Sequence, residues 1–286
     1  MQQTPTIWTV LSMLEWATDY FEQKGVKSPR LSIEWLLAFV LQKKRLDLYL
    51  CYDQPLTSDE LQKLRALVKR RSLHEPLQYI IGQTTFYNAD IAVNEHVLIP
   101  RQETEQLVQI ILDTFSDSTN LRVLDIGTGS GCIPIALKME RPNWQVMATD
   151  ISGDALALAT KNAVLNKVDI TFSQQDLFNP SFDNLETKFD LIISNPPYVL
   201  KADEAGLDKE VKEYEPHLAL FCESTENMFS ALENYCSNYL ANSGSAYFEI
   251  HENEAAKTAQ VFLNNNWETI IIDDYDLKER FLKISR

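Results

Sequence analysis

The chain has 286 residues, of which 45% are hydrophobic, so it can fill the core of one large domain or two smaller ones. The sequence does not open with a basic stretch followed by an apolar run, and no apolar run approaches the roughly 18 residues that cross a bilayer, so we expect neither a secretion signal nor a membrane partner. The four cysteines lie far apart, which argues against a metal site and fits a reduced, cytoplasmic setting.

The net charge of −15 is unevenly distributed along the chain. Residues 1–85 contain 11 Lys or Arg and 9 Asp or Glu, whereas the remainder contains 15 and 32. Nucleic acids are bound mainly through Lys and Arg contacts to phosphates. The acidic remainder of the chain therefore argues against nucleic acid as a substrate.

The first 80 residues have the spacing of amphipathic helices. Apolar residues recur at helical intervals from Ile7 to Ala17 and again from Leu31 to Leu41. Thr57, followed three positions later by Glu60, has the pattern of a capping box and predicts the start of another helix. We therefore expect a small helical bundle over residues 1–80.

The predicted bundle contains two basic clusters, at residues 43–45 and 69–71. We interpret them as solvated helix ends, which is the usual place for Lys and Arg. The alternative is a docking surface for a large partner.

Residues 81–100 have a different character and predict a β-hairpin that connects two domains. Residues 84–87 and 91–93 have strand composition, and residues 88–90 between them have turn composition.

From residue 101 to residue 286, strand-like apolar runs alternate with helical patterns. Such alternation predicts an α/β fold, with a doubly wound, Rossmann-like parallel sheet of seven strands and helices on both faces. The expected strands cover residues 121–126, 144–149, 168–172, 191–194, 246–250, 268–272 and 281–285.

A glycine-rich turn lies where the first of these strands ends and a helix begins. Ligands of open parallel sheets bind at this edge, and glycines let them approach the backbone. The spacing G-x-G-x-G differs from the G-x-G-x-x-G of dinucleotide loops, and the preceding Asp125 would repel a pyrophosphate but attract an ammonium group. We therefore favour S-adenosylmethionine as the cofactor, with a dinucleotide or a purely structural turn as alternatives. The turn consists of Gly127, Thr128, Gly129, Ser130 and Gly131.

Two more strand ends carry side chains that suit this cofactor. Asp150 ends the second strand, where a carboxylate can accept hydrogen bonds from both ribose hydroxyls. The alternative is that Asp150 caps the next helix, a role that Ser152 could fill alone. Asp176 and Leu177 follow the third strand, where an acid could accept from the adenine amino group and an apolar side chain could cover the ring.

The segment Asn195-Pro196-Pro197-Tyr198 follows the fourth strand. The prolines remove two N–H donors, which leaves the Asn195 side-chain oxygen and the Pro196 carbonyl as acceptors and Tyr198 as a flat ring. Two acceptors can orient the two hydrogens of a planar nitrogen and stabilise its growing positive charge. We therefore predict N-methylation, with Asn195, Pro196 and Tyr198 catalytic, Pro197 in the substrate site and Asn195 also contacting the cofactor. The alternative is a rigid proline turn.

Over nearly its whole length, the chain resembles the release factor glutamine methyltransferases. The tetrapeptide alone is shared with adenine and guanine N-methyltransferases, so the resemblance depends on further segments, of which Pro100–Glu105 discriminates best. The matching segments are residues 76–82, 97–105, 127–131, 195–198, 214–216 and 219–220, and Asp276 with Arg280.

The resemblance implies a class I methyltransferase domain that N5-methylates the glutamine of a Gly-Gly-Gln motif in a peptide chain release factor. It implies S-adenosylmethionine, converted to S-adenosylhomocysteine, and no metal. It places Arg101 and Glu103 at the rim of the substrate site and gives the helical bundle a docking role. The chain departs from the family pattern at Gln102, Cys222–Glu226 and His251, which concern substrate contacts. The alternative activity is methylation of an exocyclic amino group of adenine or guanine in nucleic acid.

Overall fold

The computed structural model describes residues 7–116, 120–180 and 188–286, which form two compact units. The first unit contains the described residues up to Gly82 together with Asp208–Tyr214, and the second contains Gln83–Leu207 and Glu215–Arg286. In the described ranges, no helix has both the length and the apolar character needed to span a membrane.

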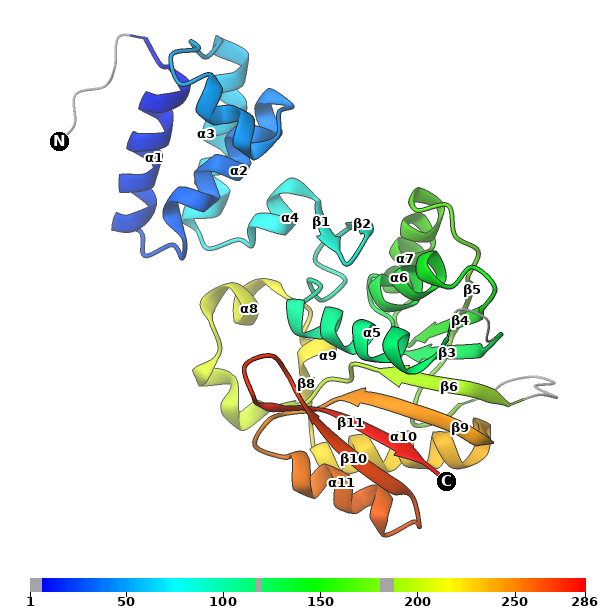
Figure 1. Ribbon diagram of the computed structural model, residues 1–286. Helices are drawn as coiled ribbons and strands as arrows, with labels where there is room; N and C mark the ends of the chain where they lie inside the picture. The colour runs from blue at the N-terminus through cyan, green and yellow to red at the C-terminus, as the bar shows by residue number, and fades with distance from the viewer. Residues whose placement is uncertain (1–6, 117–119, 181–187) are drawn as a thin grey trace. The chain divides into compact units, whose positions relative to one another are not determined.

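The first unit is helical, as the sequence predicts (Figure 1). Its apolar helix faces meet in one core, to which α1, α2 and α3 contribute most of the side chains. Its elements are α1 (Val10–Gln23), α2 (Pro29–Leu41), the 3₁₀ helix η1 (Arg45–Leu50), α3 (Ser58–Ser72), α4 (Leu77–Ile81) and α8 (Lys209–Tyr214).

The predicted capping box at the start of α3 is confirmed. The Thr57 hydroxyl accepts from the backbone N–H of Glu60 at 3.3 Å, and the Glu60 carboxylate accepts from the backbone N–H of Thr57 at 2.7 Å. Ile7, which we expected in the apolar stripe of α1, does not belong to it, because it precedes the helix and is 69% exposed.

The interpretation of residues 69–71 as a solvated helix end is wrong for Arg71. This side chain is 4% exposed and donates to the Ser32 hydroxyl at 3.1 Å, the Glu75 carbonyl at 2.8 Å and the Glu210 carboxylate at 2.8 Å. A guanidinium can be buried when its donors are paired in this way, and here it links three segments of the first unit.

The predicted hairpin is present in the second unit, where β1 (Gln83–Phe86) and β2 (Ala89–Ala92) pair antiparallel. The turn is shorter than expected, since Ala89 already pairs with Phe86. A two-residue hairpin turn favours positive φ, and Tyr87 supplies it with φ of 54°.

The main sheet of the second unit has seven strands in the order β10-β11-β9-β6-β3-β4-β5 (Figure 1). The expectation of an all-parallel sheet is wrong for one strand, because β11, which lies between β10 and β9, runs antiparallel to both. The connection from β10 to β11 is a tight turn, which can join only antiparallel neighbours. The strands are β3 (Arg122–Ile126), β4 (Gln145–Asp150), β5 (Thr171–Gln174), β6 (Phe189–Ser194), β9 (Leu240–Glu249), β10 (Glu268–Asp273) and β11 (Glu279–Ser285).

Helices cover both faces of this sheet, so it is doubly wound as predicted (Figure 1). Helices α5 (Gln102–Thr114), α6 (Cys132–Glu140) and α7 (Gly153–Leu165) pack on one face, and α10 (Thr225–Tyr239) and α11 (Ala255–Leu263) pack on the other. Short elements complete the unit: β7 (Val199–Leu200), η2 (Lys201–Gly206), α9 (His217–Leu220) and β8 (Phe221–Cys222).

Candidate active site

A cavity of about 320 Å³ lies at the carboxyl ends of the parallel strands in the second unit. It brings together residues that are far apart in the sequence, as expected for an open α/β sheet. Within the described ranges, no cluster of three His, Cys, Asp or Glu side chains could hold a metal ion. The predicted site residues that line the cavity are Arg101, Gly127, Thr128, Gly129, Ser130, Asp150, Asp176, Leu177, Asn195, Pro196 and Pro197.

The glycine turn uses its glycines for two different purposes. Gly127 and Gly129 have φ of 72° and 54°, and a Cβ on either would meet nothing within 4 Å, so the backbone is bare on its open side. Gly131 has φ of 80°, and a Cβ there would lie 3.0 Å from the Cβ of Ala159. The first two glycines therefore leave room for a ligand, while Gly131, which lies outside the cavity lining, allows α6 and α7 to pack closely.

Asp150 braces this turn. One carboxylate oxygen accepts from the backbone N–H of Gly129 at 2.8 Å and the other from that of Ser152 at 2.9 Å. Burial raises the pKa of Asp150, and these backbone donors lower it in part. Ser152 itself caps α7 by accepting from Ala155, so the helix does not need Asp150 as its cap.

Asp125, two residues before the turn, is a buried acid that does not itself line the cavity. It is 1% exposed, and burial raises its pKa to about 7, although the nearby Thr128 hydroxyl offsets part of the shift. Among the described residues, neither oxygen of this carboxylate has a partner in hydrogen-bonding geometry, and the same holds for the Thr128 and Ser130 hydroxyls. Buried polar groups are almost always paired, so this set suits a ligand that brings donors or positive charge.

Asp176 and Leu177 follow β5, the strand next to β4, and both line the cavity. One Asp176 carboxylate oxygen accepts from the backbone N–H of Phe178 at 2.9 Å, which fixes the local turn. Leu177 is half-buried against the core between the sheet and α10 and α11. The cavity therefore offers an acid beside an apolar surface, the combination that was predicted for an adenine ring.

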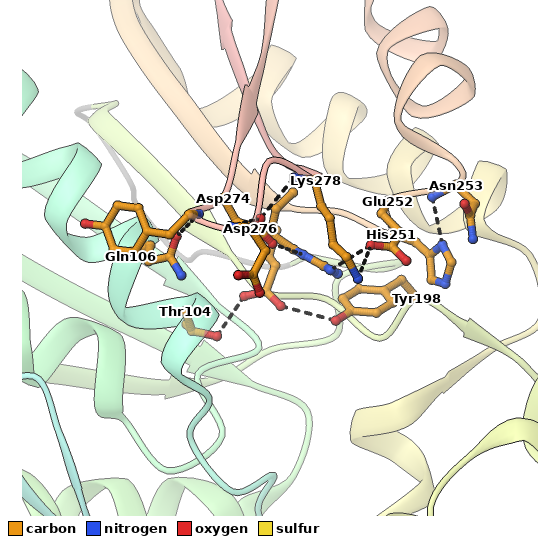
Figure 2. A network of polar contacts seen from close by, with 12 residues as sticks. Thr104, Gln106, Tyr198, His251, Glu252, Asn253, Asp274, Asp276 and Lys278 are labelled. Atoms are coloured by element: carbon orange, nitrogen blue, oxygen red, sulfur yellow. Dashed lines mark hydrogen bonds and ion pairs between the residues drawn. The ribbon is translucent and has the colours of Figure 1, made fainter.

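At the other end of the cavity, Asn195 takes part in a buried chain of hydrogen bonds. Its side-chain nitrogen donates to the Thr104 hydroxyl oxygen at 3.1 Å, and the Thr104 hydroxyl donates to the Glu249 carboxylate at 2.7 Å. The Tyr198 hydroxyl donates to the second oxygen of Glu249 at 3.2 Å (Figure 2). Thr104 and Glu249 are 3% and 2% exposed.

Sequence reasoning missed Thr104 and Glu249 as site residues. Thr104 lies inside the segment that discriminates the family, but no role was assigned to it. Glu249 is the one charged residue in the apolar strand run 246–250, and a charge in such a run is a signal of a buried polar partner.

Tyr198 lies outside the cavity lining, and its ring packs edge-to-face against His251 at 5.9 Å between centroids. Burial and the neighbouring Glu249 charge raise the pKa of Tyr198, so its hydroxyl stays protonated as a donor. Its neighbours therefore hold this ring at both its edge and its hydroxyl.

Arg101 and Glu103, both expected at the rim, have different environments. Arg101 lines the cavity and forms an ion pair with Glu215 at 2.5 Å, whose side chain is 1% exposed. This pair anchors the segment that continues into Pro216, another lining residue. Glu103 lies in the first turn of α5, is exposed, and is not part of the lining.

The turn between β10 and β11 is fixed by charged side chains beside this network (Figure 2). Arg280 contacts Asp274 and Glu252, each at 3.3 Å. The backbone N–H of Tyr275 donates to Gln106 of α5 at 2.8 Å, which joins the turn to the helix that carries Thr104.

Comparison with known proteins agrees with this geometry. The PrmC N-terminal domain model matches residues 12–82, and the methyltransferase small domain model matches residues 99–213. A release factor glutamine methyltransferase from Leptospira interrogans is 38% identical over 283 residues, which cover 97% of this chain and 98% of that protein. The chain belongs to the release factor glutamine methyltransferase family.

Two further similarities fit this assignment. The family member from Geobacter sulfurreducens is 44% identical over 220 residues, covering 77% of this chain and 76% of that protein. A methyltransferase structure from Pyrococcus furiosus aligns with a TM-score of 0.51 at 17% identity, covering 69% of this chain and 89% of that one. The structural match shows the shared methyltransferase fold.

Proposed function

We propose that this chain transfers a methyl group from S-adenosylmethionine to the side-chain amide nitrogen of the glutamine in a release factor Gly-Gly-Gln motif. The observation that carries the proposal is one cavity lined both by the glycine turn and by Asn195, Pro196 and Pro197. The names of the relatives support the release factor as substrate. Such a substrate fits a cytoplasmic enzyme of translation termination.

The cofactor end has groups that match each part of S-adenosylmethionine. Bound there, this cofactor would supply an electrophilic methyl group. The backbone of the turn Gly127–Gly131 and the unpaired Asp125 would receive the amino acid moiety, since a buried carboxylate lacking donors favours an ammonium group. Asp150 would accept the ribose hydroxyls, and Asp176 and Leu177 would hold the adenine.

The other end has groups that match a planar amide. Because the Asn195 side-chain nitrogen is engaged by Thr104, its oxygen remains as an acceptor. Together with the Pro196 carbonyl it would hold both hydrogens of the glutamine nitrogen. As the new bond forms, positive charge develops on this nitrogen, and fixed acceptors stabilise it until one hydrogen leaves as a proton. The rate of methyl transfer would then come from the orientation of the nitrogen towards the methyl group, and no strong base would be needed.

The division of labour along the chain follows from these assignments. We assign binding of the release factor to the helical residues 1–80, a connecting role to the hairpin segment 81–100, and methyl transfer to residues 101–286. Arg101 and Glu103 would border the entering substrate, and Tyr198 would support the amide plane.

The test is direct. The full chain is incubated with S-adenosylmethionine and a purified release factor, and tandem mass spectrometry of the digest locates any added methyl group. We expect it on the glutamine of Gly-Gly-Gln and not on a variant in which that glutamine is glutamate. Parallel incubations with RNA and DNA test the alternative substrate. Methylated adenine or guanine with an unmodified glutamine would overturn the proposal.

A further inference from the structure

The hydrogen-bond chain behind Asn195 determines which atom of its amide faces the cavity. The Thr104 hydroxyl has one hydrogen, and it donates this hydrogen to Glu249 at 2.7 Å. The Thr104 oxygen can therefore only accept from Asn195, at 3.1 Å. The nitrogen of the Asn195 amide is thus turned towards Thr104, and its oxygen is turned away from it.

We propose that Thr104 and Glu249 are positioning residues, which lock the Asn195 amide in the orientation that offers an acceptor to the substrate nitrogen. The proposal rests on the proposed function and deepens it, because it explains how the site selects an N–H nucleophile. A flipped Asn195 would offer a donor and repel the hydrogens of a glutamine amide.

The direction of the lock comes from the charge on Glu249. An ionised carboxylate has only acceptors, so it must receive the hydrogens of both Thr104 and Tyr198. A protonated Glu249 could donate to Thr104 instead, and Thr104 could then donate to Asn195 and reverse its amide. The lock therefore requires Glu249 to be ionised.

The groups around Glu249 act on its charge in opposite directions. Burial raises the pKa of Glu249 overall, with a small further rise from Glu103 of α5. Hydrogen bonds from Thr104 and Tyr198 and the charge of Arg280 oppose this rise and favour the ionised form. Arg280, on β11, itself forms ion pairs with Asp274 and Glu252. These contacts give Arg280 a role in the lock, because it is the cation that favours the ionised form of Glu249.

Replacing the hydroxyl of Thr104 tests the lock directly. Thr104→Val keeps the shape of the side chain and removes the hydroxyl that links Asn195 to Glu249. We expect the single-turnover rate of glutamine methylation to fall about tenfold, with the Kd for S-adenosylmethionine unchanged, because one orienting hydrogen bond is lost. Thr104→Ser should restore the rate. Thr114→Val, on the same helix but exposed, is the matched control and should leave the rate unchanged.

A pH profile distinguishes positioning from a merely structural role. Arg280→Met removes the cation and should move the acid limb of the rate to higher pH, because the pKa of Glu249 rises. Glu249→Gln should remove that limb and lower the rate at every pH. A wild-type rate in Thr104→Val, or an unmoved acid limb in Arg280→Met, would overturn the lock while the wild-type chain still methylates glutamine. If the wild-type chain methylated no glutamine, the proposed function itself would fail.

Discussion

The two ends of the cavity are built by different means. The cofactor end is formed by backbone conformation within a short stretch, residues 125–131, braced by Asp150. The amide end depends on side chains from distant parts of the chain. Thr104 hydrogen-bonds to Asn195, 91 positions later, and to Glu249, 145 positions later. At the cofactor end, the Asp125 carboxylate and the Thr128 and Ser130 hydroxyls have no hydrogen-bond partners among the described residues. At the amide end, by contrast, Thr104, Glu249 and Tyr198 are hydrogen-bonded to one another or to Asn195.

The two ends of the cavity thus differ in how many of their polar groups are paired within the protein. Under the proposed function, a bound ligand would complete the hydrogen bonds of the cofactor end, so the stability of this end and its affinity for the ligand would be coupled. At the amide end, the side chains that position Asn195 are already paired, so the orientation of Asn195 is fixed before the substrate arrives, which is what catalysis by orientation requires. Substitutions at the two ends should therefore produce separable defects.

The largest effect is expected at the amide end. Asn195→Ala removes an acceptor aimed at the reacting nitrogen and should lower the single-turnover methylation rate about 100-fold to 1000-fold. The Kd for S-adenosylmethionine, measured by calorimetry, should change little. Asn234→Ala, an exposed change on α10, serves as the control. A large loss of cofactor affinity with normal transfer would show that the two ends are wrongly assigned.

A smaller effect of the opposite kind is expected at the cofactor end. Asp150→Ala removes a charged acceptor that also braces Gly129, and should weaken S-adenosylmethionine binding by about 2 kcal/mol, roughly 30-fold in Kd. At saturating cofactor the transfer rate should recover. Asp154→Ala, a neighbouring exposed acid in the first turn of α7, is the matched control. Equal losses in both variants would point to a general effect of charge.

The smallest effect concerns the unpaired Asp125 and sharpens the contrast in stability. Its pKa is raised from 3.8 to about 7 in the folded protein, so the folded chain binds this proton more tightly than the unfolded chain. The stability that this group contributes is complete below its unfolded pKa and is lost as pH rises through about 7. The unfolding free energy of the protein without cofactor should therefore fall between about pH 4 and about pH 7, by at most about 1.4 kcal/mol per pH unit, and this contribution should level off above that range.

Asp125→Asn should flatten this part of the pH dependence, as measured by urea denaturation across the same range. The comparison with wild type cancels every contribution that the two proteins share. Identical slopes would mean that Asp125 is not protonated on folding and that the cofactor end is better satisfied than its contacts indicate.

Local signals predicted most of the fold. The Thr57–Glu60 capping box, the strands that carry the glycine turn and Asn195, and the hairpin were all found because neighbouring residues determine them. The antiparallel β11 was missed, since strand direction depends on how the short turn before it reverses the chain. The buried position of Arg71 was missed because its partners Ser32 and Glu210 lie 39 and 139 residues away.

The sequence by itself was enough to predict the reaction, methyl transfer to a planar nitrogen. The glycine turn and the Asn195–Tyr198 segment are each a continuous stretch of sequence, and their residue types limit which ligands they can hold. Only the tertiary structure decided how Asn195 is oriented. Thr104, Asn195 and Glu249 belong to a helix, a strand end and another strand, and nothing in their spacing shows that they meet. Their hydrogen bonds form because the sheet and α5 pack together, and a side chain's partners in such packing are independent of sequence distance.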